Sequence, residues 1–445
     1  MANSIALDET PNPESEDSHG HHGDLALRPG EIAVGVIIGR IGEFFDFFVY
    51  GIASALVFPR LFFPFASTYE GLIYSFAIFA VGFVARIPGA LLFRFVHDRH
   101  GRGTKLSAAL MLLGTSTVCI AFLPGYETAG AVSIVLLVVL RFTQGMAVGG
   151  AWDGLPSLLA VSAPQGRKGW FAMISQIGAP LGFLVAAGLF SFLSSSIAEQ
   201  DFISWGWRFA FFTAFAINVV TLFARLRMAV TPEFEHLFEI RELTPSPLPD
   251  LFRNKSGDIA LGALAPLGSY ALFHLVTIFP LTWTVEGDAN FTRETIFTLQ
   301  IVGVFICFAT MLVSGLIADK IGRARTMLWS MIITALFCIP APWMGNTDFG
   351  AFAFIPTGFA VLGFSLAQSA GAMNNCFEHQ YRYSGALVTN ELSWLLGAAF
   401  APLIALVIAH SLGNAGVAYF VVAAAAVSIV VLGLNLKRVE ALERE

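Results

Sequence analysis

Twelve apolar windows, each about 20 residues long, run along this 445-residue chain. A window of that length crosses the hydrocarbon core of a bilayer as an α-helix, which satisfies its own backbone hydrogen bonds where lipid offers no partners. The windows begin near Ile32, Gly71, Leu106, Val132, Gly169, Trp207, Ile259, Thr295, Thr326, Phe349, Gly385 and Val417. They predict an all-α membrane protein with twelve transmembrane helices.

The composition agrees with a membrane protein and argues against other classes. Charged residues make up 13 % of the chain and hydrophobic residues 56 %, whereas a soluble domain carries roughly 25 % charged residues. The four cysteines lack paired spacing, so neither a disulfide nor a zinc site is predicted. The sequence shows no phosphate loop, metal cluster or nucleophile–base pair. We therefore expect that the protein is not an enzyme, that it uses no cofactor or metal, and that it has no nucleic-acid partner.

One short charged segment occurs twice, in equivalent places of the two halves. Residues 98–102 read Asp-Arg-His-Gly-Arg and residues 319–323 read Asp-Lys-Ile-Gly-Arg. Such a repeat predicts two pseudo-symmetric six-helix bundles, with which many transporters expose one site alternately to either side of a membrane. The expected parts are a disordered cytoplasmic tail (1–29), an N-terminal bundle (30–227), a cytoplasmic linker (228–257), a C-terminal bundle (258–437) and a cytoplasmic tail (438–445).

Lysine and arginine gather in alternate turns between the windows. The turns after odd-numbered windows hold mainly Arg60 and Arg293 together with several acids, whereas the turns after even-numbered windows are basic. Because basic turns stay on the cytoplasmic side, both chain termini are expected there. The basic turns contain Arg99, Arg102, Lys105, Arg167, Lys168, Lys320, Arg323, Arg325 and Arg382.

The first window carries an acidic stripe. At 100° per residue, one helix face collects Gly39, Glu43, Asp46 and Tyr50. Lipid cannot solvate two carboxylates, so this face is expected to line a water-filled cavity. An alternative is that the acids only pair with basic groups and lock the helices together.

Two arginines in neighbouring windows are the expected partners of the stripe. Arg86 lies in the second window, and Arg141 lies in the fourth window with Gln144 one turn later. A guanidinium that stays charged in an apolar interior needs an anion beside it, and Glu43 and Asp46 are the expected anions if the first, second and fourth windows line one cavity. A carboxylate whose partner and hydration both change when a cavity opens is suited to carrying a proton.

Polar residues also share helix faces in the second half. Tyr270 and His274 are one turn apart, and Asn390, Glu391 and Trp394 share a face. They are candidates for the second wall of a pocket. Alternatively, His274 only forms an interhelical hydrogen bond, as lone polar groups in bundles commonly do.

Several motifs, taken in their order, resemble those of a known family. The matching segments are residues 42–47 (Gly-Glu-Phe-Phe-Asp-Phe) with Tyr50-Gly51, Arg86 with Pro88-Gly89, 98–102, 141–145 with 149–150, 166–169, 206–208, 231–234 and 382–385. At these residues the chain resembles the major facilitator superfamily and, within it, the metabolite:proton symporter family. Members of that family carry citrate, 2-oxoglutarate, shikimate, proline or betaine.

The resemblance implies the major facilitator fold, with two six-helix bundles about a central cavity. It implies proton coupling by Asp46 and Arg141, with Glu43 alongside. It also implies a gating latch, to which we assign Asp98, Arg99, Arg102, Asp153, Asp319 and Arg323. The expected pocket residues are Tyr50, Arg86, Gln144, Tyr270, His274, Asn390, Glu391 and Trp394.

The chain departs from the family's pattern near these positions. Ala151 stands where Glu is usual, with Asp153 two residues later. Residues 390 and 391, often Tyr and Asn or Gln, are Asn390 and Glu391. The departures leave room for a cargo different from that of the familiar members.

The predicted function is proton-coupled symport of a small polar metabolite, an organic carboxylate or a zwitterion, with Arg86 or Arg141 as the cationic contact. The proton gradient would drive this transport, and the transporter would work as a monomer in a bacterial inner membrane. Two alternatives remain open. Residues 178–182 (Gly-Ala-Pro-Leu-Gly) faintly resemble an antiporter helix, which would indicate a proton-driven exporter. The other alternative is a membrane receptor that binds without transporting.

Overall fold

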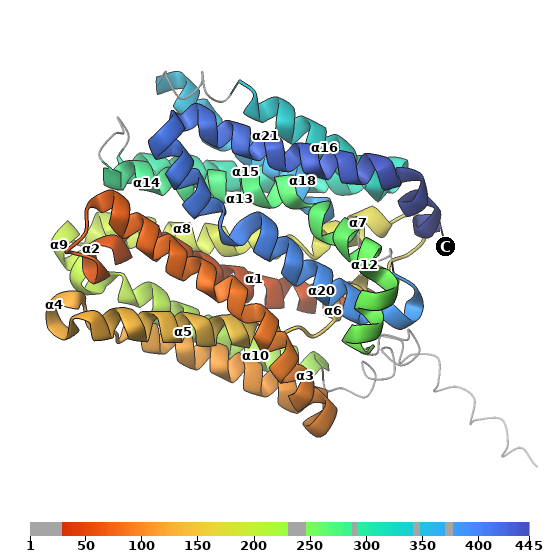
Figure 1. The fold of residues 1–445 in the computed structure, drawn as a ribbon, viewed down its shortest axis with the longest axis horizontal. Coiled ribbons are helices and arrows are strands. Elements are labelled where there is room, and N and C mark those ends of the chain that lie inside the picture. The colour runs from red at the N-terminus through yellow and green to blue at the C-terminus, as the bar shows by residue number, and fades with distance from the viewer. Residues whose placement is uncertain (1–28, 230–245, 287–291, 341–347, 370–376, 445) are drawn as a thin grey trace, which may run out of the picture.

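The computed structural model describes residues 29–229, 246–286, 292–340, 348–369 and 377–444, and the regular structure of these ranges is helical (Figure 1). Long helices lie side by side along one common direction. We call residues 29–229 the N half and residues 246–444 the C half. The predicted tail 1–29, apart from Pro29, and residues 230–245 of the predicted linker lie outside the described ranges.

The N half consists of long helices joined by short ones. Its elements are α1 (Pro29–Leu56), α2 (Phe58–Phe62), α3 (Thr68–Ala121), α4 (Tyr126–Ala129), α5 (Ala131–Gly150), α6 (Leu155–Val161), α7 (Lys168–Ile174), α8 (Gly178–Ser196), α9 (Glu199–Asp201), the π-helix η1 (Phe202–Gly206) and α10 (Arg208–Ala229).

The C half is built in the same way. Its elements are α12 (Leu248–Leu264), α13 (Leu267–Thr277), α14 (Phe279–Glu286), α15 (Arg293–Ile321), α16 (Arg323–Cys338), α18 (Asp348–Ser369), the 3-10 helix η2 (His379–Tyr381), α20 (Arg382–Trp394), the π-helix η3 (Leu395–Ala399) and α21 (Ala401–Arg444).

The helices of the described ranges match the twelve predicted windows. Nine continuous helical stretches of these ranges, some of which join several of the elements above, are long and apolar enough to cross a membrane. One of the nine, Thr68–Ala121, changes direction at Gly101 and supplies two windows. The remaining two windows lie on α1, which carries Arg40, Glu43 and Asp46, and on α16, which has 16 residues. The predicted all-α membrane fold of two six-helix bundles is confirmed.

The repeated charged segment makes the same turn in both halves. Gly101 has φ 81° and Gly322 has φ 91°, and each stands three residues after the acid of its segment. A side chain at such a φ is disfavoured, so glycine lets one helix end and the next begin within a single residue. Internal symmetry inferred from the sequence thus appears as a shared backbone conformation.

The molecule has two different ends. One end, here called the terminal end, holds the start of α1, the turns at Gly101 and Gly322, and the end of α21. The opposite, distal end holds α2, α4, α9 and α14. At the terminal end α21 runs on through residues 438–444, which were expected to be a tail. Arg438 holds this extension to the buried Asp258 at 2.6 Å, and Val439 is 1 % exposed.

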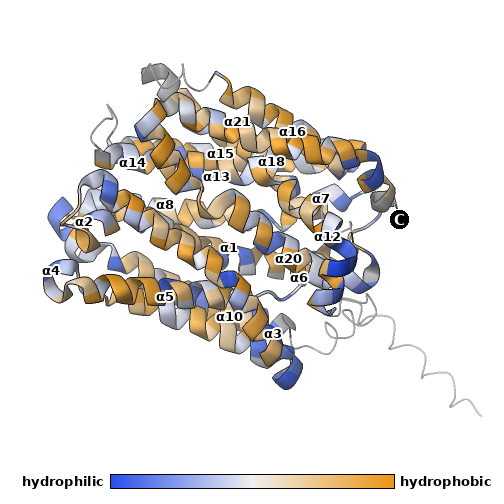
Figure 2. Cartoon of the chain, in the orientation of Figure 1, coloured by the Kyte–Doolittle hydropathy of each residue, from blue (hydrophilic) through white to orange (hydrophobic). Residues whose placement is uncertain are grey.

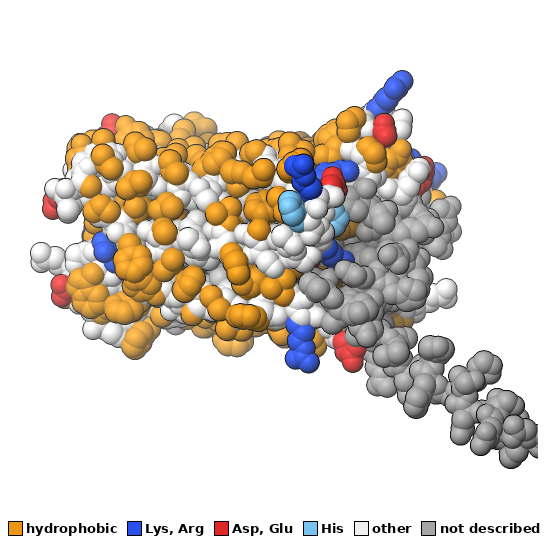
Figure 3. Space-filling model, turned by 90° about the horizontal axis from the view of Figure 1, so that it is seen from below, with side chains coloured by type: hydrophobic (Ala, Val, Ile, Leu, Met, Phe, Trp, Pro, Cys, Tyr) orange, Lys and Arg blue, Asp and Glu red, His pale blue; other side chains and the backbone are white. Residues whose placement is uncertain are grey.

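Apolar side chains cover the flanks of the molecule between its two ends. Figure 2 shows hydrophobic residues along the helix lengths and hydrophilic residues mainly at the terminal end. In Figure 3 the visible flank is largely hydrophobic, with charged side chains near its two ends. Large apolar residues such as Phe223 and Leu434 are exposed to the surroundings of the molecule. In water this exposure would be unfavourable, whereas lipid is a suitable solvent for it.

Candidate functional site

A cleft lies between the two halves, toward the terminal end. It consists of two adjoining small hollows that share Arg40, Trp152, Pro156 and Asn390. The first is also lined by Ser175, Gly262, Tyr270, Ser369, Ala386, Thr389 and Ser393. The second is also lined by Gly35, Val36, Gly39, Glu43, Val148, Ala151, Asp153, Leu155, Arg225 and Glu391. Both halves therefore contribute walls to one space.

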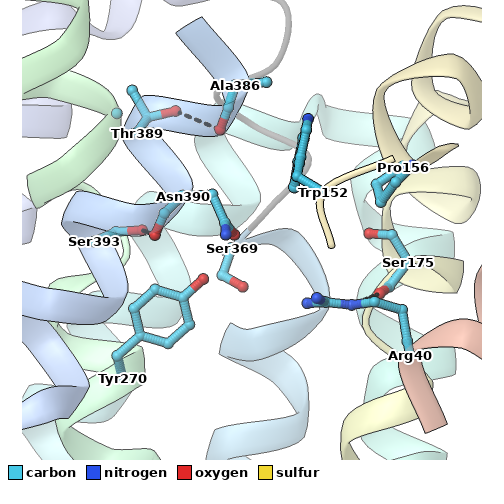
Figure 4. Close-up of a pocket in the computed structure, with 11 residues that line it drawn as sticks. Arg40, Trp152, Pro156, Ser175, Tyr270, Ser369, Ala386, Thr389, Asn390 and Ser393 are labelled. Atoms are coloured by element: carbon cyan, nitrogen blue, oxygen red, sulfur yellow. Dashed lines mark hydrogen bonds between the residues drawn. The ribbon is translucent and has the colours of Figure 1, made fainter. Parts of the chain in front are cut away.

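Figure 4 shows how the first hollow is arranged. The Arg40 guanidinium, from α1, points into the hollow beside Ser175. Asn390 and Ser393 of α20, Ser369 and the Tyr270 hydroxyl lie on the opposite side. The Tyr270 ring is held in place by stacking on Trp394, with the ring centroids 4.3 Å apart. The hollow thus places a cation opposite neutral hydrogen-bonding groups.

Three ion pairs involve residues that line the cleft. Arg40 Nη1 lies 3.0 Å from Glu43 Oε2 on the same helix. Arg225 Nη2 lies 2.7 Å from Asp153 Oδ2, within the N half. The third pair, between Arg86 and Glu391, joins the two halves.

Arg86 of the N half and Glu391 of the C half are 3.8 Å apart. The prediction that Glu43 and Asp46 are the direct partners of Arg86 and Arg141 is therefore wrong. Glu43 pairs with Arg40 instead, because the two are one turn apart on α1. Arg86 reaches Glu391 because α20 packs against α3.

Asp46 lies deeper in the N half and outside the residues that line the cleft. Its Oδ1 accepts hydrogen bonds from Thr117 (2.7 Å) and Asn218 (3.1 Å), and its Oδ2 accepts one from Gln144 (2.8 Å). The side chain is buried, at 4 % exposure. The expectation that the whole acidic stripe lines one wet cavity therefore holds for Glu43 and fails for Asp46 and Tyr50.

Arg141 reaches Asp46 only through Gln144. Its Nη1 donates to Gln144 Oε1 at 2.6 Å, and the amide group of the same glutamine donates to Asp46. The guanidinium also donates to the carbonyl of Phe79 and lies over the Tyr50 ring, 3.9 Å from its centroid. A neutral amide therefore separates a buried acid from a buried cation.

His274 is placed away from the cleft. It is 1 % exposed, and neither ring nitrogen has a hydrogen-bond partner among the described residues. Its ring lies among Phe47, Phe79 and Phe273, with centroid distances of 5.4 to 5.7 Å. In this conformation His274 is part of an aromatic cluster between the halves and does not contact the cleft.

Three of the predicted latch residues, Asp98, Arg99 and Arg102, have their described contacts within the N half. Asp98 is 59 % exposed and lies 3.9 Å from Arg94 on its own helix, while Arg99 lies over the Phe95 ring. Among the described residues, neither has a contact with the C half in this conformation. Arg102 donates to the carbonyl of Asp153 and so braces the N half internally.

Asp319, another predicted latch residue, contacts the other half. Its Oδ1 accepts hydrogen bonds from the backbone N–H groups of Gly169 (2.8 Å) and Trp170 (3.1 Å) at the start of α7. Arg323, which follows at the same turn, is buried at 2 % exposure. A cross-half contact thus exists at the terminal end, on the second copy of the repeated segment.

At the distal end Glu199 links the two halves. Its Oε1 lies 2.5 Å from Arg60 of the N half and 3.4 Å from Arg293 of the C half. The hydrogen bond from Arg60, together with the charge of Arg293, lowers the pKa of Glu199 below its ordinary value. Nearby, the rings of Tyr69 and His410 stack across the halves, with centroids 4.0 Å apart.

Reasoning from the sequence missed several of these residues. Arg40, Trp152 and Ser175 line the cleft, and Thr117 and Asn218 hold Asp46. Arg40 alone carried a usable signal, since it is a cation three residues before Glu43 inside an apolar window. The hydroxyl and amide residues carried none, because such groups are common in transmembrane helices.

Comparisons with known proteins agree with this architecture. A model of the Major Facilitator Superfamily matches residues 36–390. The chain is 32 % identical over 415 residues to the inner membrane metabolite transport protein YhjE of Escherichia coli K12, covering 91 % of this chain and 93 % of that protein. It is 32 % identical over 397 residues to the shikimate transporter of the same organism, covering 86 % and 89 % of the two chains.

A proline/betaine transporter of the same organism is 26 % identical over 416 residues, which cover 90 % of this chain and 82 % of that protein. Among solved structures, that of a D-xylose–proton symporter superimposes with a TM-score of 0.69 at 16 % identity, covering 91 % and 97 % of the two chains. At that identity the structural likeness concerns the fold alone.

Proposed function

The chain belongs to the major facilitator superfamily and is a membrane transporter of metabolites, and from this premise we propose that it carries a small polar metabolite together with a proton. The cargo would bind in the cleft between the halves. Arg40 and Arg86 would supply the cationic contacts, and Tyr270, Asn390 and Ser393 would supply neutral hydrogen bonds.

The surroundings of Asp46 are the observation that carries the proposal. Three neutral side chains hydrogen-bond its carboxylate, and Arg141 is kept one amide group away. Because no cation among the described residues contacts Asp46, the carboxylate can take up a proton without breaking an ion pair. Acids buried within membrane helices commonly mark proton pathways.

Alternating access would proceed by rocking of the two halves about the cleft. Asp319 joins the halves at the terminal end, and Glu199 joins them at the distal end. Opening either end requires that its own contacts break while the other set remains. Two separate sets of contacts, one at each end, are what such a mechanism needs.

We also propose that the terminal end faces the cytoplasm of a bacterial cell and that the monomer is the working unit. Basic residues gather at this end, as the positive-inside rule requires. The driving force would be the proton gradient, with no cofactor.

The experiment is transport by purified protein in proteoliposomes under an imposed pH gradient. Asp46→Asn is expected to abolish uphill uptake while counterflow exchange remains measurable, since a neutral amide keeps the shape of the site but cannot bind the coupled proton. Asp201→Asn, an exposed acid at the distal end, is the matched control. Uphill uptake at the wild-type rate in Asp46→Asn would refute the assignment.

The direction of proton movement separates the two modes of coupling. For a symporter, adding cargo outside the vesicles raises the external pH as protons enter with it. A fall in external pH would instead indicate the proton-driven exporter.

A further inference from the structure

The charged side chains that line the cleft are paired. The lining acids are Glu43, Asp153 and Glu391, and the cations that pair with them are Arg40, Arg225 and Arg86. Every guanidinium of this set therefore already has a carboxylate beside it. Among the described residues that line the cleft, both cations, Arg40 and Arg225, are paired with carboxylates, so a cargo with two or three negative charges would bring surplus charge into a space of low dielectric.

The ion pairs differ in how fully their polar atoms are hydrogen-bonded. Arg225 donates twice to Asp153 Oδ2 and once to the carbonyl of Ala151, while Asp153 Oδ1 accepts the N–H of Leu155. This pair is saturated by the N half alone. It acts as a fixed part of the wall and offers little to a ligand.

The pair of Arg86 and Glu391 is incomplete. At 3.8 Å the two are in electrostatic contact but too far apart for a hydrogen bond. Glu391 Oε1 accepts a hydrogen bond from Asn390 at 3.1 Å, whereas the buried Oε2 has no donor among the described residues. A buried carboxylate oxygen without a donor is costly, and a bound ligand that supplies one would remove that cost.

A cationic group is the ligand part that suits this position. It would contact the spare oxygen of Glu391, while a carboxylate on the same molecule would reach Arg40, which lines the same hollow. Trp152 lines the same hollow as Glu391, and its indole ring favours a cation near its face. One molecule with both charges would leave the cleft neutral.

We infer that the cargo is a zwitterion, with a carboxylate and an ammonium group, and that Glu391 selects it over anions of the same shape. This inference rests on the proposed function, since it names the cargo class of that same cleft. Glu391 then acts as a specificity-determining residue from the C half, and its contact with Arg86 crosses between the halves.

The test is ligand binding to the purified full chain in detergent, measured by thermal shift and by calorimetry. Two pairs of nearly isosteric probes differ in the cationic nitrogen. β-Alanine is compared with butanoate, and proline with cyclopentanecarboxylate, since the ammonium group of each zwitterion carries the N–H donors that Glu391 Oε2 lacks. Succinate and citrate supply the polyanions, and the common amino acids extend the zwitterions.

Wild-type protein is expected to bind a zwitterion about tenfold or more tightly than its anionic isostere, because a buried charge is left unpaired by the isostere. Glu391→Gln should abolish most of this difference. Glu391→Asp, which keeps the charge, should retain the preference with weaker binding. Glu294→Gln, at an exposed glutamate of the distal end, is the matched control.

Several results would overturn the inference. The first is that wild-type protein binds succinate, citrate or an anionic isostere at least as tightly as any zwitterion. The second is that it binds no zwitterion in the panel. The third is that folded Glu391→Gln keeps the full preference for zwitterions. If Glu391→Gln does not fold, the wild-type comparison and Glu391→Asp still decide. Binding in detergent needs no proton gradient, so a failure of proton coupling at Asp46 would leave this result unaffected.

Discussion

The carboxylate of Asp319, in the C half, accepts a 2.8 Å hydrogen bond from the backbone N–H of Gly169, in the N half. A second bond comes from the N–H of Trp170 at 3.1 Å. Both donors belong to the first turn of α7, where backbone N–H groups have no partner within the helix. One side chain thus closes part of the terminal end.

Replacing Asp319 with alanine is expected to favour opening of the terminal end, because both hydrogen bonds to α7 are lost. Each such bond to a charged acceptor contributes about 1.5–3 kcal/mol, so an increase in accessibility of roughly tenfold or more is expected. The measurement is the alkylation rate of a cysteine placed at Ser393 in the cleft, with Cys119 and Cys376 replaced by serine.

Asp98→Ala is the matched control for that experiment. Asp98 occupies the equivalent position in the first copy of the repeated segment, but it is exposed, and its ion-pair partner among the described residues, Arg94, lies on its own helix. An equal rise in alkylation for the two variants would contradict the view that Asp319 is the residue that joins the halves.

Acidification is expected to loosen the distal end through Glu199. Arg60 and Arg293 lower the pKa of this carboxyl group in the closed arrangement. Its contribution to closure is therefore present above the ordinary carboxyl pKa and is lost as the pH falls through the lowered pKa. Because the pair is exposed, the effect should be modest, about two- to fivefold.

Hydrogen exchange of the amides near α9 and the start of α15, corrected for intrinsic rates, follows this opening. Glu199→Gln should raise exchange at neutral pH and remove the acid-dependent part. Glu127→Gln, at another exposed acid of the distal end, should do neither. An unchanged pH profile in Glu199→Gln would exclude Glu199 as the titrating group.

Gln144 is expected to matter more to proton coupling than Asn218 does. Among the described residues Gln144 is the donor to Asp46 Oδ2, and it also separates Asp46 from Arg141. Asp46 Oδ1 keeps the Thr117 bond when Asn218 is removed. Gln144→Ala should reduce uphill uptake at least about tenfold, with a smaller loss in Asn218→Ala, consistent with the loss of a buried hydrogen bond.

Proteoliposome uptake with and without a pH gradient measures this difference. Counterflow exchange, which needs no net proton movement, serves as the internal control for folding and cargo binding. Equal losses of uphill uptake in the two variants would argue against a relay through the Gln144 amide.

Gly145→Ala is expected to destabilise the N half. A Cβ at this position would lie 2.1 Å from the carbonyl oxygen of Gly82, so α3 and α5 would have to separate. Overpacking of this kind costs about 1–3 kcal/mol. Thermal unfolding in detergent should show a lower midpoint than that of wild type.

Gly188→Ala is the control for the close helix contact. A Cβ at Gly188, in α8, meets nothing within 4 Å. Alanine is also the better helix former, so this variant should be as stable as wild type or slightly more stable. A comparable loss of stability in both variants would show that steric contact is not the cause.

The sequence by itself determined the helices, their number and the internal repeat. These features depend on local physics, because an apolar window of about 20 residues and a glycine at a positive φ act through their own segment. Gly101 and Gly322 illustrate this, since their equivalent places in the sequence became equivalent turns. The charged candidates were likewise recognisable one by one, because ionisable groups in apolar windows are rare.

Only the tertiary structure decided which of those charges meet. Glu43 pairs with Arg40, Arg86 pairs with Glu391 of the other half, and neutral hydrogen-bond donors surround Asp46. The partner of a charge depends on how the helices are rotated and packed, and residues far apart in sequence set that arrangement. The asymmetry between Asp98 and Asp319 has the same origin: one short segment, present twice, lies against different neighbours.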